Sequence, residues 1–116
     1  MREFELSDFK TEVNENEKTA VFFYADWAAP SRSMNASAEK AFEKAQKYYV
    51  EQYENGGGFS CGAMPADDNK ELLLILGVKV IPTICLIEKG VVVNKIEGYR
   101  SEKELTGDLM DFIDNV

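Results

Sequence analysis

The chain has 116 residues, of which 45% are hydrophobic and 29% charged, a balance that predicts one soluble domain with a single core over residues 1–116. Twenty-one acidic residues against 13 basic ones give a formal net charge of −8, which disfavours nucleic acid and anionic membrane surfaces as partners. No segment approaches the roughly 18 consecutive apolar residues of a membrane span, and the first residues lack the apolar core of a signal peptide. We therefore expect a cytoplasmic protein.

The chain contains no histidine and only two cysteines, Cys61 and Cys85. The commonest general base and the commonest metal ligand are thus absent, so we expect no metal site, no cofactor and no serine-hydrolase chemistry. Cys85 lies in the apolar run Thr83–Ile87 and is expected to be a buried, inert thiol. Cys61 has small neighbours, which predicts the more accessible sulfur and the one thiol left for redox chemistry.

The first half of the chain alternates strand and helix patterns, which indicates an α/β fold. Glu3–Leu6 is a short candidate strand, and Ser7 is positioned to cap a brief helix ending near Val13. Thr19–Ala25 is apolar on both faces, as a central strand is. Pro30 opens a long helix with apolar residues at helical spacing that ends near Tyr53.

The second half continues this alternation. Phe59–Met64 is a weak candidate strand. The segment 67–69 is expected to start a helix whose apolar face comprises Leu72, Leu73, Ile75 and Leu76, and the acidic pair Asp67-Asp68 is explained by the positive end of that helix. A hairpin of Thr83–Ile87 and Val91–Glu97 turns at Lys89-Gly90, and Ser101 with Glu104 forms a capping box for the last helix.

The segment Trp27-Ala28-Ala29-Pro30-Ser31-Arg32 has the frame of a Cys-x-Pro-Cys active site in which both sulfurs are missing. A thiol-disulfide enzyme requires a thiolate nucleophile, and Ala28 supplies none. Ser31 is either a hydrogen-bonding residue of the loop or a small polar residue tolerated in the first turn of the helix, and the second interpretation is favoured. The loop therefore predicts a degenerate site at Ala28 and Ser31, with no catalytic residue.

This loop, the segment Ile81-Pro82-Thr83, the hairpin, Gly98 and the closing helix follow one another in an order that resembles the thioredoxin family, from about Glu3 to the C-terminus. The resemblance implies an α/β thioredoxin fold with a central mixed sheet of about five strands flanked by about four helices. It also implies a cis peptide bond before Pro82, which lies beside the loop. The family's surface for an extended polypeptide maps onto Trp27, Ala29, Pro30, Ile81, Pro82 and Gly98.

Redox-active members of the family carry a buried carboxylate on the second strand and a lysine on the third. Counting from Trp27 places Phe22 at the carboxylate position, and counting from Asp67 places Ala63 at the lysine position. The resemblance thus implies that the proton acceptor of the reaction is missing together with the nucleophiles.

Three hypotheses follow from these observations. The first is a redox-inactive domain that binds a protein or an extended polypeptide, as an adaptor or a chaperone-like module. The second is a protein-disulfide oxidoreductase of the thioredoxin type in which the cysteines at 28 and 31 were substituted by Ala28 and Ser31. The third is a structural subunit whose binding surface is filled by its own assembly. The sequence does not decide the oligomeric state.

Overall fold

A computed structural model describes residues 1–54 and 56–115. The elements follow one another as α1 (Leu6–Glu15), β1 (Lys18–Tyr24), α2 (Ala29–Gln52), β2 (Phe59–Pro65), α3 (Lys70–Leu76), β3 (Thr83–Glu88), β4 (Val91–Glu97) and α4 (Glu102–Asp114). The four strands form one mixed sheet in the order β2-β1-β3-β4. Only β1 and β2 run parallel. None of the described helices has the length and apolarity that crossing a lipid bilayer requires.

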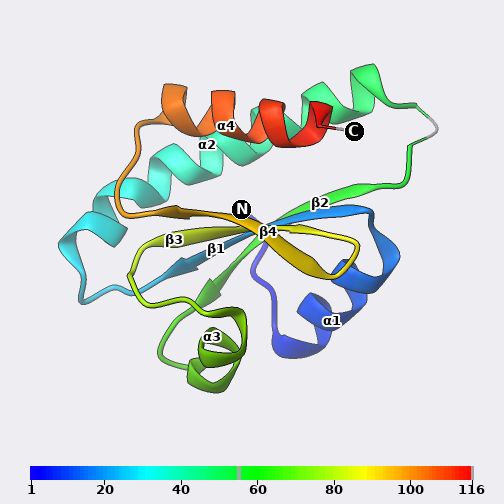
Figure 1. The fold of residues 1–116 in the computed structure, drawn as a ribbon. Coiled ribbons are helices and arrows are strands. Elements are labelled where there is room, and N and C mark those ends of the chain that lie inside the picture. Colours follow the sequence, from blue (N-terminus) through cyan, green and yellow to red (C-terminus); the bar gives the residue numbers. More distant parts are fainter. Residues whose placement is uncertain (55, 116) are drawn as a thin grey trace.

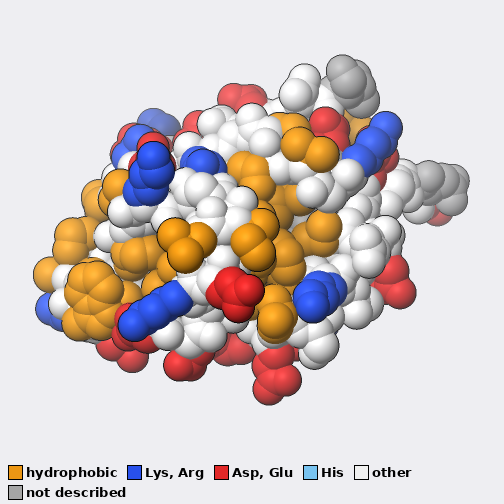
Figure 2. All heavy atoms as spheres, turned by 60° about the horizontal axis from the view of Figure 1, so that its bottom comes forward, with side chains coloured by type: hydrophobic (Ala, Val, Ile, Leu, Met, Phe, Trp, Pro, Cys, Tyr) orange, Lys and Arg blue, Asp and Glu red, His pale blue; other side chains and the backbone are white. Residues whose placement is uncertain are grey.

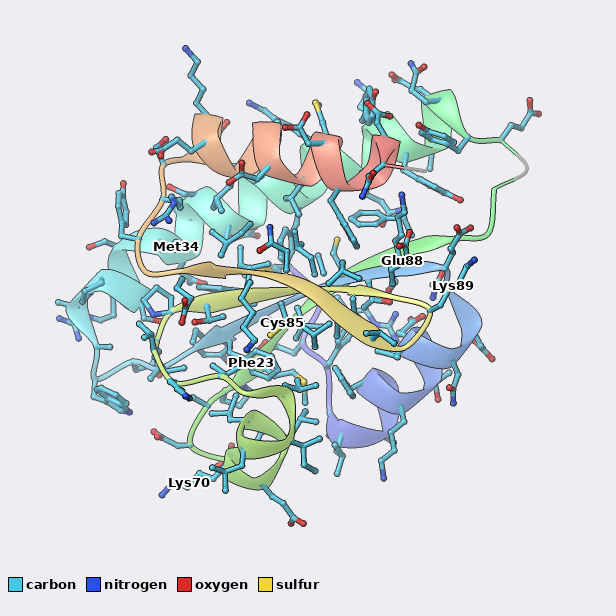
Figure 3. All side chains as sticks on the ribbon, viewed as in Figure 1. Phe23, Met34, Lys70, Cys85, Glu88 and Lys89 are labelled. Atoms are coloured by element: carbon cyan, nitrogen blue, oxygen red, sulfur yellow. The ribbon has the colours of Figure 1, made fainter. Side chains whose placement is uncertain are left out.

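The sheet is the middle of three layers (Figure 1). Helices α2 and α4 lie side by side on one face, and α1 and α3 cover the other. Figure 3 shows Met34 on the side of α2, and Phe23 with Cys85 on the side of α1 and α3. Each face has its own cluster of buried apolar side chains, which contains Met34 in the first case and Phe23 with Cys85 in the second. The expected α/β architecture is therefore confirmed.

Strand β1 is central, as its apolar pattern predicted, and its residues Lys18 to Phe23 are all buried. The hairpin prediction is also confirmed. Lys89 and Gly90 connect β3 to β4 with φ angles of 51° and 80°, and two consecutive positive φ values form a turn whose twist matches the flanking strands. The capping box at Ser101 and Glu104 begins α4, as predicted.

The prediction of a first strand over Glu3–Leu6 is wrong. The segment makes a single bridge from Glu3 to Ala63, and its chain turns into α1 at Leu6. The cap of this helix is Glu5, whose side chain and that of Asp8 form a reciprocal capping box, so the assignment of Ser7 as the cap is wrong as well. The sheet therefore has four strands, one fewer than expected.

The prediction for the apolar face of α3 is wrong in one residue. Leu72, Leu73 and Leu76 are half-buried, but the side chain of Ile75 is 74% exposed. Residues 72–76 are all apolar, so no polar position in the sequence marks which side of the helix faces water. The seven-residue helix buries one side of this run and exposes the other, and Figure 2 shows hydrophobic side chains at the surface on the face where α1 and α3 lie.

A buried lysine joins the start of β1 to the end of α4. The Nζ atom of Lys18 donates hydrogen bonds to the carbonyl oxygens of Phe112 at 2.8 Å and Ile113 at 2.9 Å, and to that of Asn115. Carbonyls at the end of a helix have no partner within it, and they carry partial negative charge. Lys18 therefore satisfies the end of α4 and holds it against the sheet.

We expect Lys18→Met to lower the free energy of unfolding by about 2 kcal/mol, because the carbonyls lose their buried donor. Denaturant titration followed by far-UV circular dichroism measures this change. Lys47→Met on the exposed side of α2 is the matched control and should change stability by less than about 0.5 kcal/mol. Equal stability of the two variants would contradict the role assigned to Lys18.

Candidate functional site

The candidate site is the loop that connects β1 to α2. β1 ends at Tyr24, and Ala28 is the N-cap of α2 with extended backbone angles and no side-chain cap. The Ala28 N–H donates to the carbonyl of Ala25 at 3.2 Å, and the Arg32 N–H donates to the carbonyl of Ala28 at 3.0 Å. Pro30 lies in the first turn, where a missing N–H leaves no helix bond unmade. The loop thus places residue 28 at the positive end of a 24-residue helix.

Ser31 has a defined partner. Its side chain is 1% exposed, and its Oγ accepts a hydrogen bond of 2.9 Å from the backbone N–H of Ala25. Of the two interpretations of Ser31, the hydrogen-bonding one agrees with the structure and the favoured one, a merely tolerated residue, is wrong, because Ser31 satisfies a buried donor at the end of β1. The sequence does not identify the partner, since the bond depends on how the loop folds back.

Trp27 is 67% exposed, so its ring projects from the loop. Its Nε1 donates to both carboxylate oxygens of Asp67, at 3.1 and 3.0 Å. Asn69 is the N-cap of α3, and the acidic residue of its first turn is Glu71, so the explanation of Asp67 by the helix end is wrong. Arg32 is exposed and donates to the carbonyl of Asp26 at 2.6 Å. The bond to Asp67 fixes the orientation of an exposed aromatic ring.

The segment before β3 lies beside the loop. The Ile81–Pro82 peptide bond is cis, and the side chain of Ile81 packs against a small cluster that contains Ala25, Ala28 and Ala66. The Gly98 N–H donates to the carbonyl of Pro82 at 2.8 Å. The structure therefore places Ile81 against the cluster of Ala28 and joins Gly98 to Pro82 by a hydrogen bond. Ala29 and Pro30 are exposed on the first turn of α2.

Phe22 and Ala63 face each other in register on β1 and β2, and both are buried. The ring of Phe22 lies 5.9 Å from that of Tyr24, between centroids. Both side chains belong to the buried layer under α2 and α4. Neither side chain can accept or donate a proton.

Both cysteines are free thiols, and Cys61 is the more accessible, as predicted. Burial raises the pKa of Cys61 to about 12 and that of Cys85 to about 11. The Cys61 Sγ lies 3.9 Å from the carbonyl oxygen of Phe42. Since the thiolate is the reactive form, both sulfurs are poor nucleophiles at neutral pH.

The chain matches the family model for thioredoxin over residues 1–111. It is similar to mitochondrial thioredoxin-2 of Schizosaccharomyces pombe, 31% identical over 80% of this chain and 62% of that protein. It is also similar to thioredoxin of Listeria monocytogenes, 32% identical over 72% of this chain and 71% of that protein. A solved structure of Plasmodium falciparum thioredoxin, 16% identical, shares the fold with a TM-score of 0.76 over 94% of this chain and 96% of that one.

The chain spans less than two thirds of the length of the mitochondrial relatives it matches, at 62% for the yeast protein and 55% for the mouse one. The family model nevertheless covers residues 1–111, nearly the whole chain. This chain belongs to the thioredoxin family.

Proposed function

We propose that this domain binds an extended polypeptide without redox catalysis. The binding surface, called here the loop surface, comprises Trp27, Ala28, Ala29, Pro30, Ile81, Pro82 and Gly98. One observation carries the proposal: Ile81 packs against the cluster that contains Ala28 at the start of α2, while residues 28 and 31 have no thiol. A cytoplasmic location remains part of this proposal.

The chemistry of the site supports the absence of catalysis. Disulfide exchange needs a thiolate to attack and a second thiol to resolve the mixed disulfide. Ala28 has only a methyl group, and the hydroxyl of Ser31 is buried against the Ala25 N–H. With Phe22 and Ala63 in the core nearby and no histidine in the chain, no described group of the site would activate a hydroxyl.

The surface chemistry supports a polypeptide ligand. An exposed aromatic ring held by a hydrogen bond is a suitable anchor for a partner. No hydrogen bond among the described residues uses the backbone N–H or C=O of Ile81. An extended chain can pair with such free groups by backbone bonds, while neighbouring apolar side chains provide selectivity.

A second candidate function is a protein-disulfide oxidoreductase with cysteines replaced at 28 and 31. It is favoured by the loop geometry, since residue 28 caps a helix N-terminus where a thiolate would be stabilised. Sequencing codons 28 and 31 of the natural gene separates the two candidates. Cysteine codons at both positions would favour the enzyme.

The first prediction for the proposed function is that the chain does not accelerate the reduction of insulin disulfides by dithiothreitol, because no thiolate forms at residue 28. Turbidity of the released insulin chains measures the rate against buffer alone. A Cys61→Ser variant is the control for the remaining accessible thiol. Turnover above buffer that persists in Cys61→Ser would contradict the proposal.

The second prediction concerns the variant Ala28→Cys/Ser31→Cys. It should form a disulfide, because the helix start is retained, and it should reduce insulin about 100-fold more slowly than an active thioredoxin, because Phe22 and Ala63 provide no proton acceptor. The loss of Ser31 also leaves the Ala25 N–H without its oxygen partner. A rate equal to that of the active thioredoxin would favour the enzyme hypothesis.

The third prediction is that extended apolar peptides bind the loop surface with a dissociation constant of about 1 μM or weaker, equivalent to about −8 kcal/mol. Amide chemical-shift changes should cluster at Trp27, Ile81 and Gly98, and Trp27→Ala should abolish them. Val50→Ala removes an apolar side chain exposed on α2 and should leave binding unchanged. Scattered shifts, or none at millimolar peptide, would refute the surface.

A further inference from the structure

Strand β4 is an open edge of the sheet. It pairs with β3 on one side, and no described strand pairs with its other side. Its side chains Val91 and Val93 are 62% and 50% exposed. Alternate N–H and C=O groups of an edge strand point outward and can pair with another extended chain. The edge is therefore a surface that backbone hydrogen bonds can extend.

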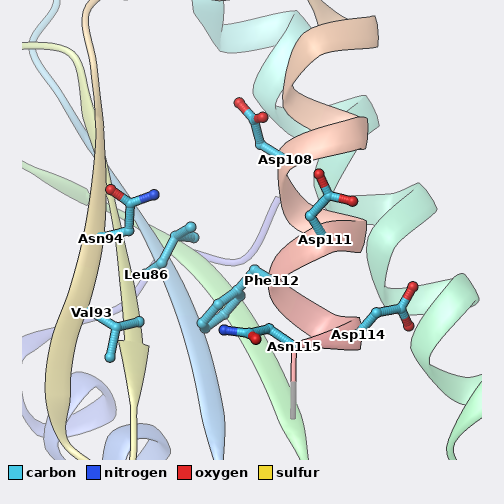
Figure 4. A pocket seen from close by; sticks show the side chains of 8 residues that line it. All are labelled: Leu86, Val93, Asn94, Asp108, Asp111, Phe112, Asp114 and Asn115. Carbon is cyan, nitrogen blue, oxygen red and sulfur yellow. The ribbon is translucent and has the colours of Figure 1, made fainter.

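A hollow of about 550 Å³ lies next to this edge, between β4 and α4 (Figure 4). Its apolar residues are Leu86, Val93 and Phe112. The pairing of β3 with β4 is irregular between Leu86 and Ile87, where Val93 has no partner, so β4 carries a bulge. Both Val93 and Asn94 line the hollow beside this bulge. We call this hollow the β4–α4 groove.

The wall of the β4–α4 groove is acidic. Asp108, Asp111 and Asp114 of α4 line it, and Figure 4 shows Asp108 on the side of α4 that faces β4 and Asp114 pointing away from β4. Among the described residues, no lysine or arginine forms an ion pair with any of the three. Asp114 accepts hydrogen bonds from Tyr48 and Tyr53, which lowers its pKa and keeps it charged. The nearby Lys95 bonds the Gly77 carbonyl toward α3. The groove thus offers negative charge to a ligand.

We propose that the edge of β4 and the β4–α4 groove bind a basic extended segment of a partner protein, which adds to the sheet as a further strand. The backbone of the segment forms hydrogen bonds with the outward N–H and C=O groups of β4. Its Lys or Arg side chains lie on the α4 face of the sheet and reach Asp108 and Asp111, while the alternate apolar side chains lie on the opposite face. Same-face residues of a strand are about 7 Å apart, and aspartates three apart on a helix lie about 5–6 Å apart. The two spacings are compatible.

Charge also argues against a second copy of this chain as the occupant. When two identical edge strands pair antiparallel about a twofold axis normal to the sheet, the same face of each sheet ends on the same side. The α4 helices would then lie on one side of the joined sheet, with Asp108 and Asp111 of both copies across the shared groove. Like charges in this arrangement repel, whereas a basic strand is attracted.

This inference does not rest on the loop surface, because the groove borders the hairpin end of β4 and the last turns of α4. The probe is an acetylated heptapeptide of alternating valine and lysine, titrated at 20 mM ionic strength while backbone amide shifts are recorded. We expect shifts and hydrogen-exchange protection within Val91–Glu97. A peptide with glutamate in place of lysine, and one with alternate N-methylated amides, should bind at least tenfold more weakly.

The decisive comparison uses two protein variants of equal net charge. Asp108→Asn/Asp111→Asn should raise the dissociation constant about fivefold, as expected for two exposed ion pairs. Glu43→Gln/Glu51→Gln, on exposed positions of α2, should change it less than twofold. Trp27→Ala should have no effect. The proposal is overturned if both charge variants respond alike, if the N-methylated peptide binds equally well, or if β4 shifts arise from dimers of the protein alone.

Discussion

The burial of β1 on both faces is the constraint on which the rest of the structure depends. This strand lies between β2 and β3 and touches the core under α2 and α4 as well as the core over α1 and α3. The chain therefore leaves the sheet at the end of β1 and continues directly to the start of α2. The beginning of the strand is fixed in the same way and brings Lys18 to the end of α4. One strand thus positions both the loop and the last helix.

The loop at the end of β1 leads into a helix start that carries no sulfur at residues 28 and 31. In a redox site, the helix start and the neighbouring polar groups act on a thiolate, so each has a use only if a sulfur is present. Here residue 28 contributes a methyl group to a small cluster with Ala25 and Ala66, and residue 31 is a serine that accepts a hydrogen bond from the Ala25 N–H. These groups pack the loop and satisfy a buried donor, and in this way they hold the loop in place.

The sequence predicted correctly those elements that are determined by residues close together in the chain. The apolar run of β1, the Lys89-Gly90 turn and the Ser101 capping box each contain their own cause within a few residues, and all three were predicted correctly. The start of α1 was predicted wrongly, because glutamate is an uncommon N-cap residue and serine, which stands at position 7, is a common one. The site contacts were also missed: the bond from Trp27 joins residues 40 positions apart, and that from Lys18 spans more than 90. Contacts between residues so far apart produce no recognisable pattern in a single sequence.

The position of Trp27 has a practical consequence for spectroscopy. It is the chain's one tryptophan, and its ring is solvent-exposed in the folded protein. Its emission will shift little when the core melts, because water surrounds the indole in both states. The same fluorescence responds to anything that covers the loop or displaces the Asp67 carboxylate. Intrinsic fluorescence is therefore a reporter of occupancy for this domain, and thermal or chemical unfolding has to be followed through the backbone.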